Sequence, residues 1–168
     1  MDVKYLHTNL IARDWRRLAA FYERVFGCVR VFPERHLAGA SIERGSGVAG
    51  ARIEGVHLRL PGFGSEGPTL EVFQYSEAAD APLPVANRVG FGHIAFAVDD
   101  VMAARDAVLA AGGAAVGTVE AVTIPGAGTI TWMYTRDPEG NIIELQRRDP
   151  ETTARRMTSA VTSGGETP

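Results

Sequence analysis

Apolar and polar residues alternate along several short segments of the chain, which is the pattern of strands with two different faces. Two other segments, residues 15–26 and 101–109, repeat apolar residues at helical spacing. Each of them follows aspartate and ends before glycine. The predicted strands span residues 3–11, 28–32, 55–60, 69–75, 91–98, 116–124, 129–135 and 142–147. The pattern therefore predicts the order strand, helix, strand, strand, strand, and predicts it twice.

The connections between these elements carry their own signals. Pro33 is expected to end the second strand or to keep it at the edge of a sheet, because proline cannot donate a backbone hydrogen bond. The glycine-rich residues 39–51 are expected to form a mobile connection with at most one short helical turn. Turns are predicted at residues 61–68 and 137–141, where proline and glycine cluster.

The two halves also share residue spacings. In each half, the distance along the chain is the same from a histidine to an aspartate, from that histidine to a glycine, and from a later glycine to a glutamate. The matched residues are His7, Asp14, Gly27, Gly67 and Glu71 in the first half and His93, Asp100, Gly113, Gly140 and Glu144 in the second. Such self-similarity indicates a duplicated unit. We therefore expect one domain, residues 1–148, built from module one (1–76), a linker (77–90) and module two (91–148). Residues 149–168 are polar and are expected to form a flexible tail.

Alternation sorts the strand residues onto two faces. One face is continuously aliphatic and suits packing under the two helices: Leu70, Val72, Ile94, Phe96, Val98, Ile143 and Leu145. The other face combines Glu71, His93 and Glu144 with apolar neighbours. An α+β fold in which two tandem βαβββ modules form a cupped mixed sheet gives each face a suitable environment. The helices then lie outside, and the histidines and glutamates lie inside.

Composition and charge exclude several classes of partner. Apolar residues make up 45% of the 168 residues and charged residues 22%, with a net charge of −3. No basic run favours nucleic acid or an anionic membrane, and no apolar run is long enough to span a bilayer. The lone Cys28 cannot form an internal disulfide and is expected to fill the core in a reducing compartment, so we expect a cytoplasmic protein.

The repeat-matched histidines and glutamates are candidate metal ligands. Glu71 lies between Leu70 and Val72, and a carboxylate within an apolar strand is costly unless it is paired or bound to a metal. The alternative for Glu71 is an ion pair with an arginine such as Arg13 or Arg59. An isolated histidine on a strand is more often structural, but the repeat favours ligands. Two imidazoles and two carboxylates suit one octahedral divalent ion, with Ni, Zn, Mn or Co favoured over Fe(II).

Other conspicuous residues have simpler interpretations. His57 lacks an obvious match in the second half and is expected at an exposed rim, and His36 is expected to be solvated. Asp137 is interpreted as a turn residue, and Trp15, Tyr22 and Phe26 as core. The walls of a substrate pocket are predicted to come from Asn9, Ile11, Phe73, Tyr75, Phe91 and Met133.

Several segments of the chain resemble the vicinal oxygen chelate superfamily, which includes glyoxalase I, methylmalonyl-CoA epimerase, bleomycin-resistance proteins and extradiol dioxygenases. The resemblance covers residues 3–147. Its most specific segments run from Gly92 to Asp100 and from Asp137 to Leu145. Shorter matching segments are His7–Leu10, Trp15–Gly27 and Leu70–Val72. The resemblance implies two βαβββ modules whose sheets close around a metal cup.

The resemblance also implies that the metal ligands come from the first and last strands of each module. These positions hold His7, Glu71, His93 and Glu144, a complete set that looks like that of glyoxalase I. Epimerases of the family usually carry glutamine in place of Glu71, and bleomycin-binding members usually lack the ligands. The implied function is a metal-dependent lyase or isomerase that moves a proton next to a carbonyl on a small chelating substrate. Glu144 is the favoured base, and Glu71 is the second candidate.

Two positions depart from glyoxalase I. Many bacterial members place Arg four residues after the first histidine and Asn four residues after the first glutamate, where both contact glutathione, but this chain has Ile11 and Tyr75 there. The expected substrate is instead a small, partly hydrophobic carbonyl or hydroxyacyl compound, or an acyl thioester. Two alternatives stay open. One is a binding or resistance protein without turnover, and the other is an Fe(II)-dependent ring-cleavage dioxygenase using His7, His93 and Glu144. The family further implies a homodimer, in which the metal site would lie within one chain or between two.

Overall fold

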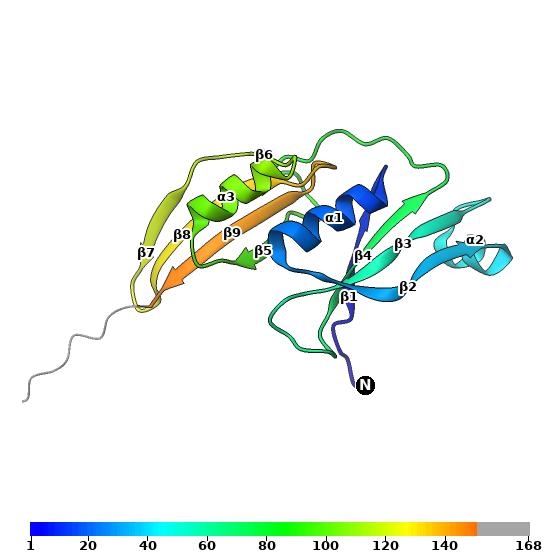
Figure 1. Ribbon diagram of the computed structural model, residues 1–168, viewed down its shortest axis with the longest axis horizontal. Coiled ribbons are helices and arrows are strands. Elements are labelled where there is room, and N and C mark those ends of the chain that lie inside the picture. Colours follow the sequence, from blue (N-terminus) through cyan, green and yellow to red (C-terminus); the bar gives the residue numbers. More distant parts are fainter. Residues whose placement is uncertain (151–168) are drawn as a thin grey trace, which may run out of the picture.

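The first half of the chain forms a four-stranded sheet in the order β1-β4-β3-β2 (Figure 1). Strand β1 (His7–Ile11) runs parallel to β4 (Thr69–Tyr75), whereas β3 (Arg52–Arg59) pairs antiparallel with both β4 and β2 (Val29–Ala38). Helix α1 (Trp15–Phe26) connects β1 to β2, and the short helix α2 (Ala40–Ser46) connects β2 to β3. The computed structural model describes residues 1–150.

The second half repeats this plan. Strand β5 (Ile94–Ala97) runs parallel to β9 (Ile142–Asp149), and β9 pairs antiparallel with β8 (Gly128–Arg136). Helix α3 (Val101–Ala110) follows β5. Two short strands, β6 (Ala114–Ala115) and β7 (Glu120–Ile124), both pair with β8 and stand where one strand is predicted. The predicted α+β fold with a duplicated βαβββ unit is confirmed.

The aspartates predicted to begin the helices act as N-caps. The Asp14 carboxylate accepts a hydrogen bond from the backbone N–H of Arg17, and the Asp100 carboxylate accepts from Met102 and Ala103. Gly27 ends α1 in the left-handed region at φ 67°, which glycine adopts without strain. Local sequence therefore determines where both long helices begin.

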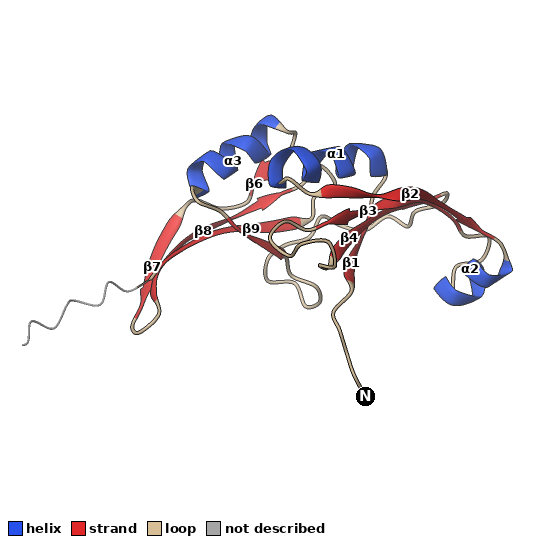
Figure 2. Cartoon of the chain, turned by 60° about the horizontal axis from the view of Figure 1, so that its bottom comes forward, coloured by secondary structure: helices blue, strands red, loops and turns tan. Residues whose placement is uncertain are grey.

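Both long helices cover the same side of the two sheets, and the opposite side of the arched sheets stays open (Figure 2). The predicted aliphatic face is confirmed, because Leu70, Val72, Ile143 and Leu145 are fully buried. The core also holds Trp15 and Tyr22 as predicted, and it is continuous across the modules. Phe26 of module one stacks on Phe96 of module two, with ring centroids 3.9 Å apart. The two modules thus share one core.

Several element boundaries differ from prediction. Strand β2 continues through Pro33 to Ala38, because it is an edge strand whose pairing with β3 shifts register between Val31 and Arg35. Strand β1 begins at His7, and β5 begins directly after His93. Strand β9 reaches Asp149, and the predicted tail otherwise lies almost wholly outside the described residues. Within residues 1–150, every helix is too short or too polar to cross a membrane.

Candidate metal centre

In module one, His7 and Glu71 converge from neighbouring parallel strands. The register of β1 and β4 places Asn9 opposite Glu71, so that His7 lies two residues away on the same face. The Nε2 atom of His7 is 3.2 Å from Oε2 of Glu71. The chain folds this way because β1 and β4 bury their aliphatic residues under α1, which turns the alternate residues to the open side.

Module two builds the same pair. The register of β5 and β9 places Ala95 opposite Glu144, and His93 again lies two residues earlier. Its Nε2 atom is 3.0 Å from Oε2 of Glu144. In both pairs the histidine side chain is 34% exposed and the glutamate 15%, so the two environments match. The structure therefore repeats the histidine–glutamate pair in three dimensions, as the spacing predicts.

The geometry of each pair fits a shared metal ion. Two ligand atoms bound about 2.1 Å from one ion at adjacent octahedral positions lie roughly 3.0 Å apart. The observed separations between imidazole nitrogen and carboxylate oxygen are 3.2 and 3.0 Å. Imidazole and carboxylate are also donors that several divalent transition metals accept. Each pair is thus suited to supply two neighbouring ligands.

One chain does not bring the four residues together. Among residues 1–150, no three His, Cys, Asp or Glu side chains are arranged so that they could hold a metal ion. The pairs belong to separate sheets, β1-β4-β3-β2 and β5-β9-β8-β6. Each chain therefore carries two separate histidine–glutamate pairs, called half-sites below. The alternative of an ion pair between Glu71 and Arg13 or Arg59 is not found among residues 1–150, where Glu71 contacts His7 and His57 and Arg13 contacts Asp80 and Glu139.

The two glutamates have different neighbours on the flanking strands. Glu71 lies between Asn9 and His57, and Asn9 Nδ2 donates to Glu71 Oε2 at 3.1 Å. Glu144 lies between two residues that give it no hydrogen bond, Ala95 and Tyr134. Its further contact comes from Gln146 on the same strand, whose Nε2 donates at 3.3 Å. Glu71 is thus held more firmly than Glu144.

His57 belongs to the half-site of module one, and the prediction of an exposed rim position is wrong. Its Nε2 atom is 3.1 Å from Oε1 of Glu71, and its ring lies edge-on to His7 with centroids 6.0 Å apart. Burial lowers the pKa of His57 below its ordinary value, and Arg35 and His7 lower it further, whereas Glu71 opposes the shift. His57 also has a structural match in module two, because Tyr134 occupies the same position opposite Glu144.

The predicted pocket residues divide into those near the half-sites and those elsewhere. Asn9 contacts Glu71, and the Phe73 ring lies edge-on to His57 with centroids 5.9 Å apart. Ile11 and Phe91 line cavities of about 480 and 180 Å³ along the linker, and Tyr75 lines another beside residues 48–51. These three residues thus lie in separate cavities rather than in one pocket.

Met133 lies on the opposite side of the sheet from the half-sites. It is 1% exposed, pairs with Leu145 and belongs to the core on the helix side of the sheet. Its neighbours Trp132 and Tyr134 take the open side instead. Their rings are 5.1 Å apart, and Tyr134 lies 5.0 Å from His93 between centroids. Neither aromatic residue is among the predicted pocket residues, because only the pairing of β8 with β9 determines which face each takes.

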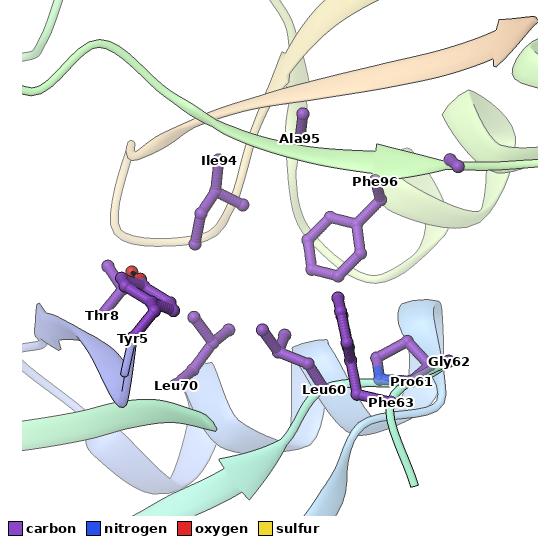
Figure 3. Close-up of a pocket in the computed structure, with 11 residues that line it drawn as sticks. Tyr5, Thr8, Leu60, Pro61, Gly62, Phe63, Leu70, Ile94, Ala95 and Phe96 are labelled. Carbon is purple, nitrogen blue, oxygen red and sulfur yellow. Dashed lines mark hydrogen bonds between the residues drawn. The ribbon is translucent and has the colours of Figure 1, made fainter. Parts of the chain in front are cut away.

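A larger cavity lies between the modules, beside the half-sites rather than within them (Figure 3). Its volume is about 540 Å³, and its walls are mainly apolar. Leu60 and Phe63 line it from the end of β3 and the following turn, and Ile94 and Phe96 line it from β5. It contains none of the four candidate ligands, and Tyr5 and Thr8 contribute hydroxyl groups to its walls.

Comparison with known proteins identifies relatives of the whole folded region. Residues 4–145 match the sequence model of a family described as the glyoxalase/bleomycin resistance protein/dioxygenase superfamily. A Vibrio parahaemolyticus protein named "Probable lactoylglutathione lyase" is 39% identical over 90 residues. That match covers 52% of this chain and 60% of the relative, so less than two thirds of the relative is represented.

Solved structures share the fold at low sequence identity. A glyoxalase family protein from Bacillus cereus superimposes with a TM-score of 0.73 at 17% identity, over 88% of this chain and 95% of that one. The fosfomycin resistance protein FosX from Listeria monocytogenes, in complex with Mn(II) and sulfate, gives a TM-score of 0.52 at 15% identity, over 89% and 95%. These likenesses concern the fold alone.

Proposed function

Because the chain belongs to the glyoxalase/bleomycin resistance protein/dioxygenase superfamily, we propose that it is a metal-dependent lyase or isomerase. The reaction proposed is proton transfer next to a carbonyl group on a small chelating substrate. The observation that carries the proposal is the repeated pair of His7 with Glu71 and His93 with Glu144, at nitrogen–oxygen separations suited to one ion. A bound Ni, Zn, Mn or Co ion would act as a Lewis acid towards the substrate oxygens.

We propose that a complete site forms between two copies of the chain. The two pairs belong to separate sheets, and strand alternation turns them away from the aliphatic face that the helices cover. His7 and Glu71 of one chain would then meet His93 and Glu144 of the partner subunit. A two-fold arrangement creates two such sites at once, since each chain supplies one half-site of either kind. The homodimer thus follows from the need to complete the ligand set.

Glu144 is the proposed base. A catalytic carboxylate must approach the substrate proton and hold it, whereas a structural ligand must stay in place. Glu71 is held at both oxygens by His7, Asn9 and His57, but Glu144 meets only His93 and the 3.3 Å contact of Gln146. The weaker restraint on Glu144 supports the role of base there, with Glu71 retained as a ligand.

The proposed substrate is small and partly hydrophobic. The name of the Vibrio relative points to a glutathione adduct. Against that, the positions that contact glutathione in many bacterial glyoxalase I sequences hold Ile11 and Tyr75 here. Trp132 and Tyr134 add an aromatic wall beside His93. A carbonyl or hydroxyacyl compound with an apolar substituent, or an acyl thioester, suits these surroundings. The proposed cytoplasmic location rests on the lone cysteine alone.

Two measurements on the purified full chain test the proposal. Metal analysis after reconstitution should find about one Ni, Zn, Mn or Co ion per chain, because a symmetric dimer has two shared sites. Hemithioacetals, acyl thioesters and 2-hydroxy ketones should then exchange a carbon-bound proton with solvent deuterium in the presence of the metal. Failure to bind metal would favour a ligand-binding protein without turnover. Iron with oxygen consumption would favour a dioxygenase using His7, His93 and Glu144.

A further inference from the structure

His57 bridges two side chains of the neighbouring strand. The antiparallel register places His57 directly opposite Glu71, and Thr69 lies two residues from Glu71 on the same face. The His57 ring contacts Glu71 Oε1 through Nε2 at 3.1 Å and Thr69 Oγ1 through Nδ1, also at 3.1 Å. Thr69 and Glu71 therefore contact the two opposite nitrogens of the same imidazole ring.

The contacts divide between the two oxygens of Glu71. His7 and Asn9 approach Oε2, and His57 approaches Oε1. His57 therefore does not point at the position where His7 and Glu71 Oε2 converge, which agrees with the absence of a three-residue metal cluster within residues 1–150. A carboxylate fixed at one oxygen keeps the other oxygen in a defined direction. Groups that fix a ligand in this way sustain metal affinity.

The chemistry of the partners determines the direction of each hydrogen bond. An ionised carboxylate only accepts, so the 3.1 Å contact between His57 Nε2 and Glu71 Oε1 is favourable when Nε2 carries the hydrogen. In the neutral ring, Nδ1 then has a lone pair and accepts a hydrogen bond from the Thr69 hydroxyl. Thr69 thereby selects the tautomer that donates to Glu71.

Packing holds the His57 ring in place. The side chain is 19% exposed, and Phe73 lies edge-on to it at 5.9 Å between centroids. Phe73 is itself buried against β3, where Gly55 leaves room for its ring because a Cβ atom at residue 55 would overlap it. Tyr134 occupies the matching position in module two and does not hydrogen-bond Glu144. The contact of His57 with Thr69 and Glu71, called the clamp below, is therefore specific to module one.

We propose that His57 is a positioning residue that, held by Thr69 and Phe73, fixes Oε1 of Glu71 and directs Oε2 towards the metal position. The inference rests on the proposed function, because it takes Glu71 as a ligand. It adds a residue outside the four ligands and explains how Glu71 and Glu144 differ in role although their strands are equivalent.

Cobalt titration of the full-length protein tests the clamp. His57→Leu should weaken Co²⁺ binding by about 10- to 100-fold, as loss of a group that supports a ligand does. His57→Gln keeps a donor near the position of Nε2 and should stay within a few-fold of wild type. His36→Gln removes the imidazole of a histidine that lies on β2 beside Glu54, and it should bind as wild type does. Unchanged Co²⁺ affinity in His57→Leu would overturn the inference while leaving the proposed function intact.

Nitrogen NMR of the metal-free protein gives a second readout and covers the case in which His57→Leu does not fold. At pH 8 the His57 ring should carry its hydrogen on Nε2, and Thr69→Val should mix the two tautomers. A wild-type ring protonated on Nδ1 would overturn the clamp. If wild type binds no Co²⁺, the proposed function fails, and the tautomer still decides whether Thr69 and His57 orient Glu71.

Discussion

The hydroxyl of Tyr22 donates a hydrogen bond to Oδ2 of Asp137 at 3.0 Å, and both residues are buried. Tyr22 lies on α1 of module one, whereas Asp137 begins the turn before β9 of module two. The same turn reaches module one again through Glu139, whose Oε1 accepts from the backbone N–H groups of Arg13 and Asp14. The turn that leads into β9, the strand of Glu144, thus connects the two modules through hydrogen bonds.

Tyr22→Phe should destabilise the protein without changing its fold. The substitution removes one of the two side-chain donors to Oδ2 of Asp137, the other being Asn141 Nδ2, and the loss of a hydrogen bond to a charged group costs about 1.5–3 kcal/mol in the free energy of unfolding. Urea denaturation followed by circular dichroism measures the loss. Tyr75→Phe is the matched control, because its half-buried hydroxyl makes no hydrogen bond within the described residues. An equal, small loss of unfolding free energy in both variants would contradict a stabilising role for the Tyr22 hydrogen bond.

The hydrogen bond between Tyr22 and Asp137 should also make the free energy of unfolding depend on pH in the alkaline range. Burial, and then the nearby Asp137, raise the pKa of Tyr22 well above its value of 10.0 in the unfolded chain. The unfolded state therefore loses its proton first, so the stability contribution is full below pH 10 and declines as the pH rises above it. The difference in unfolding free energy between wild type and Tyr22→Phe should shrink from pH 9 to 11. A constant difference would show that Tyr22 titrates normally.

Mixing two inactive chains should restore part of the metal binding if the site is shared. One chain carries His7→Gln and Glu71→Gln, and the other carries His93→Gln and Glu144→Gln. A mixed dimer then contains one complete site and one site without any original ligand. Random pairing of equal amounts after joint refolding should recover about a quarter of the wild-type sites.

Calorimetric titration with Co²⁺ counts these sites, and each doubly substituted chain alone is the control. Zero recovery from a mixture of folded chains would contradict a site shared between copies.

Glu144→Gln should separate catalysis from metal binding. The amide keeps a ligand oxygen but cannot take a proton, so turnover should fall by about 10²- to 10⁴-fold while metal affinity falls less. Solvent deuterium exchange on the best substrate of the screen measures the first quantity and Co²⁺ titration the second. Glu77→Gln removes one carboxylate from an exposed position and serves as the control. Retained exchange in Glu144→Gln would reject Glu144 as the base.

Cys28 should react slowly with thiol reagents in the native protein. It is 4% exposed, and burial, with Glu23 nearby, raises the pKa of its thiol from 9.0 to about 12. That shift lowers the thiolate fraction at pH 8 by about a thousandfold, and the thiolate is the reactive form. Labelling with a disulfide reagent, followed by absorbance, should be slow in buffer and fast in urea. Equally fast labelling in both would contradict the buried position.

Local sequence was sufficient for the order of the main elements and for the choice of the four candidate ligands. Helix α1 matches its predicted bounds, because Asp14 caps it and Gly27 ends it through interactions within a few residues. Strand alternation correctly separated Leu70 and Val72 from Glu71, since burial on one side fixes which residues face the core. The duplicated spacing then identified the His7–Glu71 and His93–Glu144 pairs, and the structure brings each pair within contact.

Local sequence did not determine the register between neighbouring strands. His57 lies opposite Glu71 only because the β3–β4 hairpin is centred on Gly64, and a shift by one residue would send it to the other face. A hairpin symmetric about the predicted turn at residues 61–68 would place Val72 opposite His57, one residue away from the observed pairing. The face that Met133 takes was undetermined for a related reason, because alternation gives two faces and only the pairing with Leu145 decides which of them lies under α3.

The sequence by itself determined that two equivalent units each carry a histidine and a glutamate, because periodicity, capping and repetition are local properties. Tertiary structure alone decided that the pairs sit on separate sheets of one chain, that His57 clamps Glu71, and that Tyr22 ties the modules through Asp137. These relationships join residues far apart along the chain, some of them through the packing of one core. Their distances depend on how whole sheets and helices fit together, which no local pattern specifies.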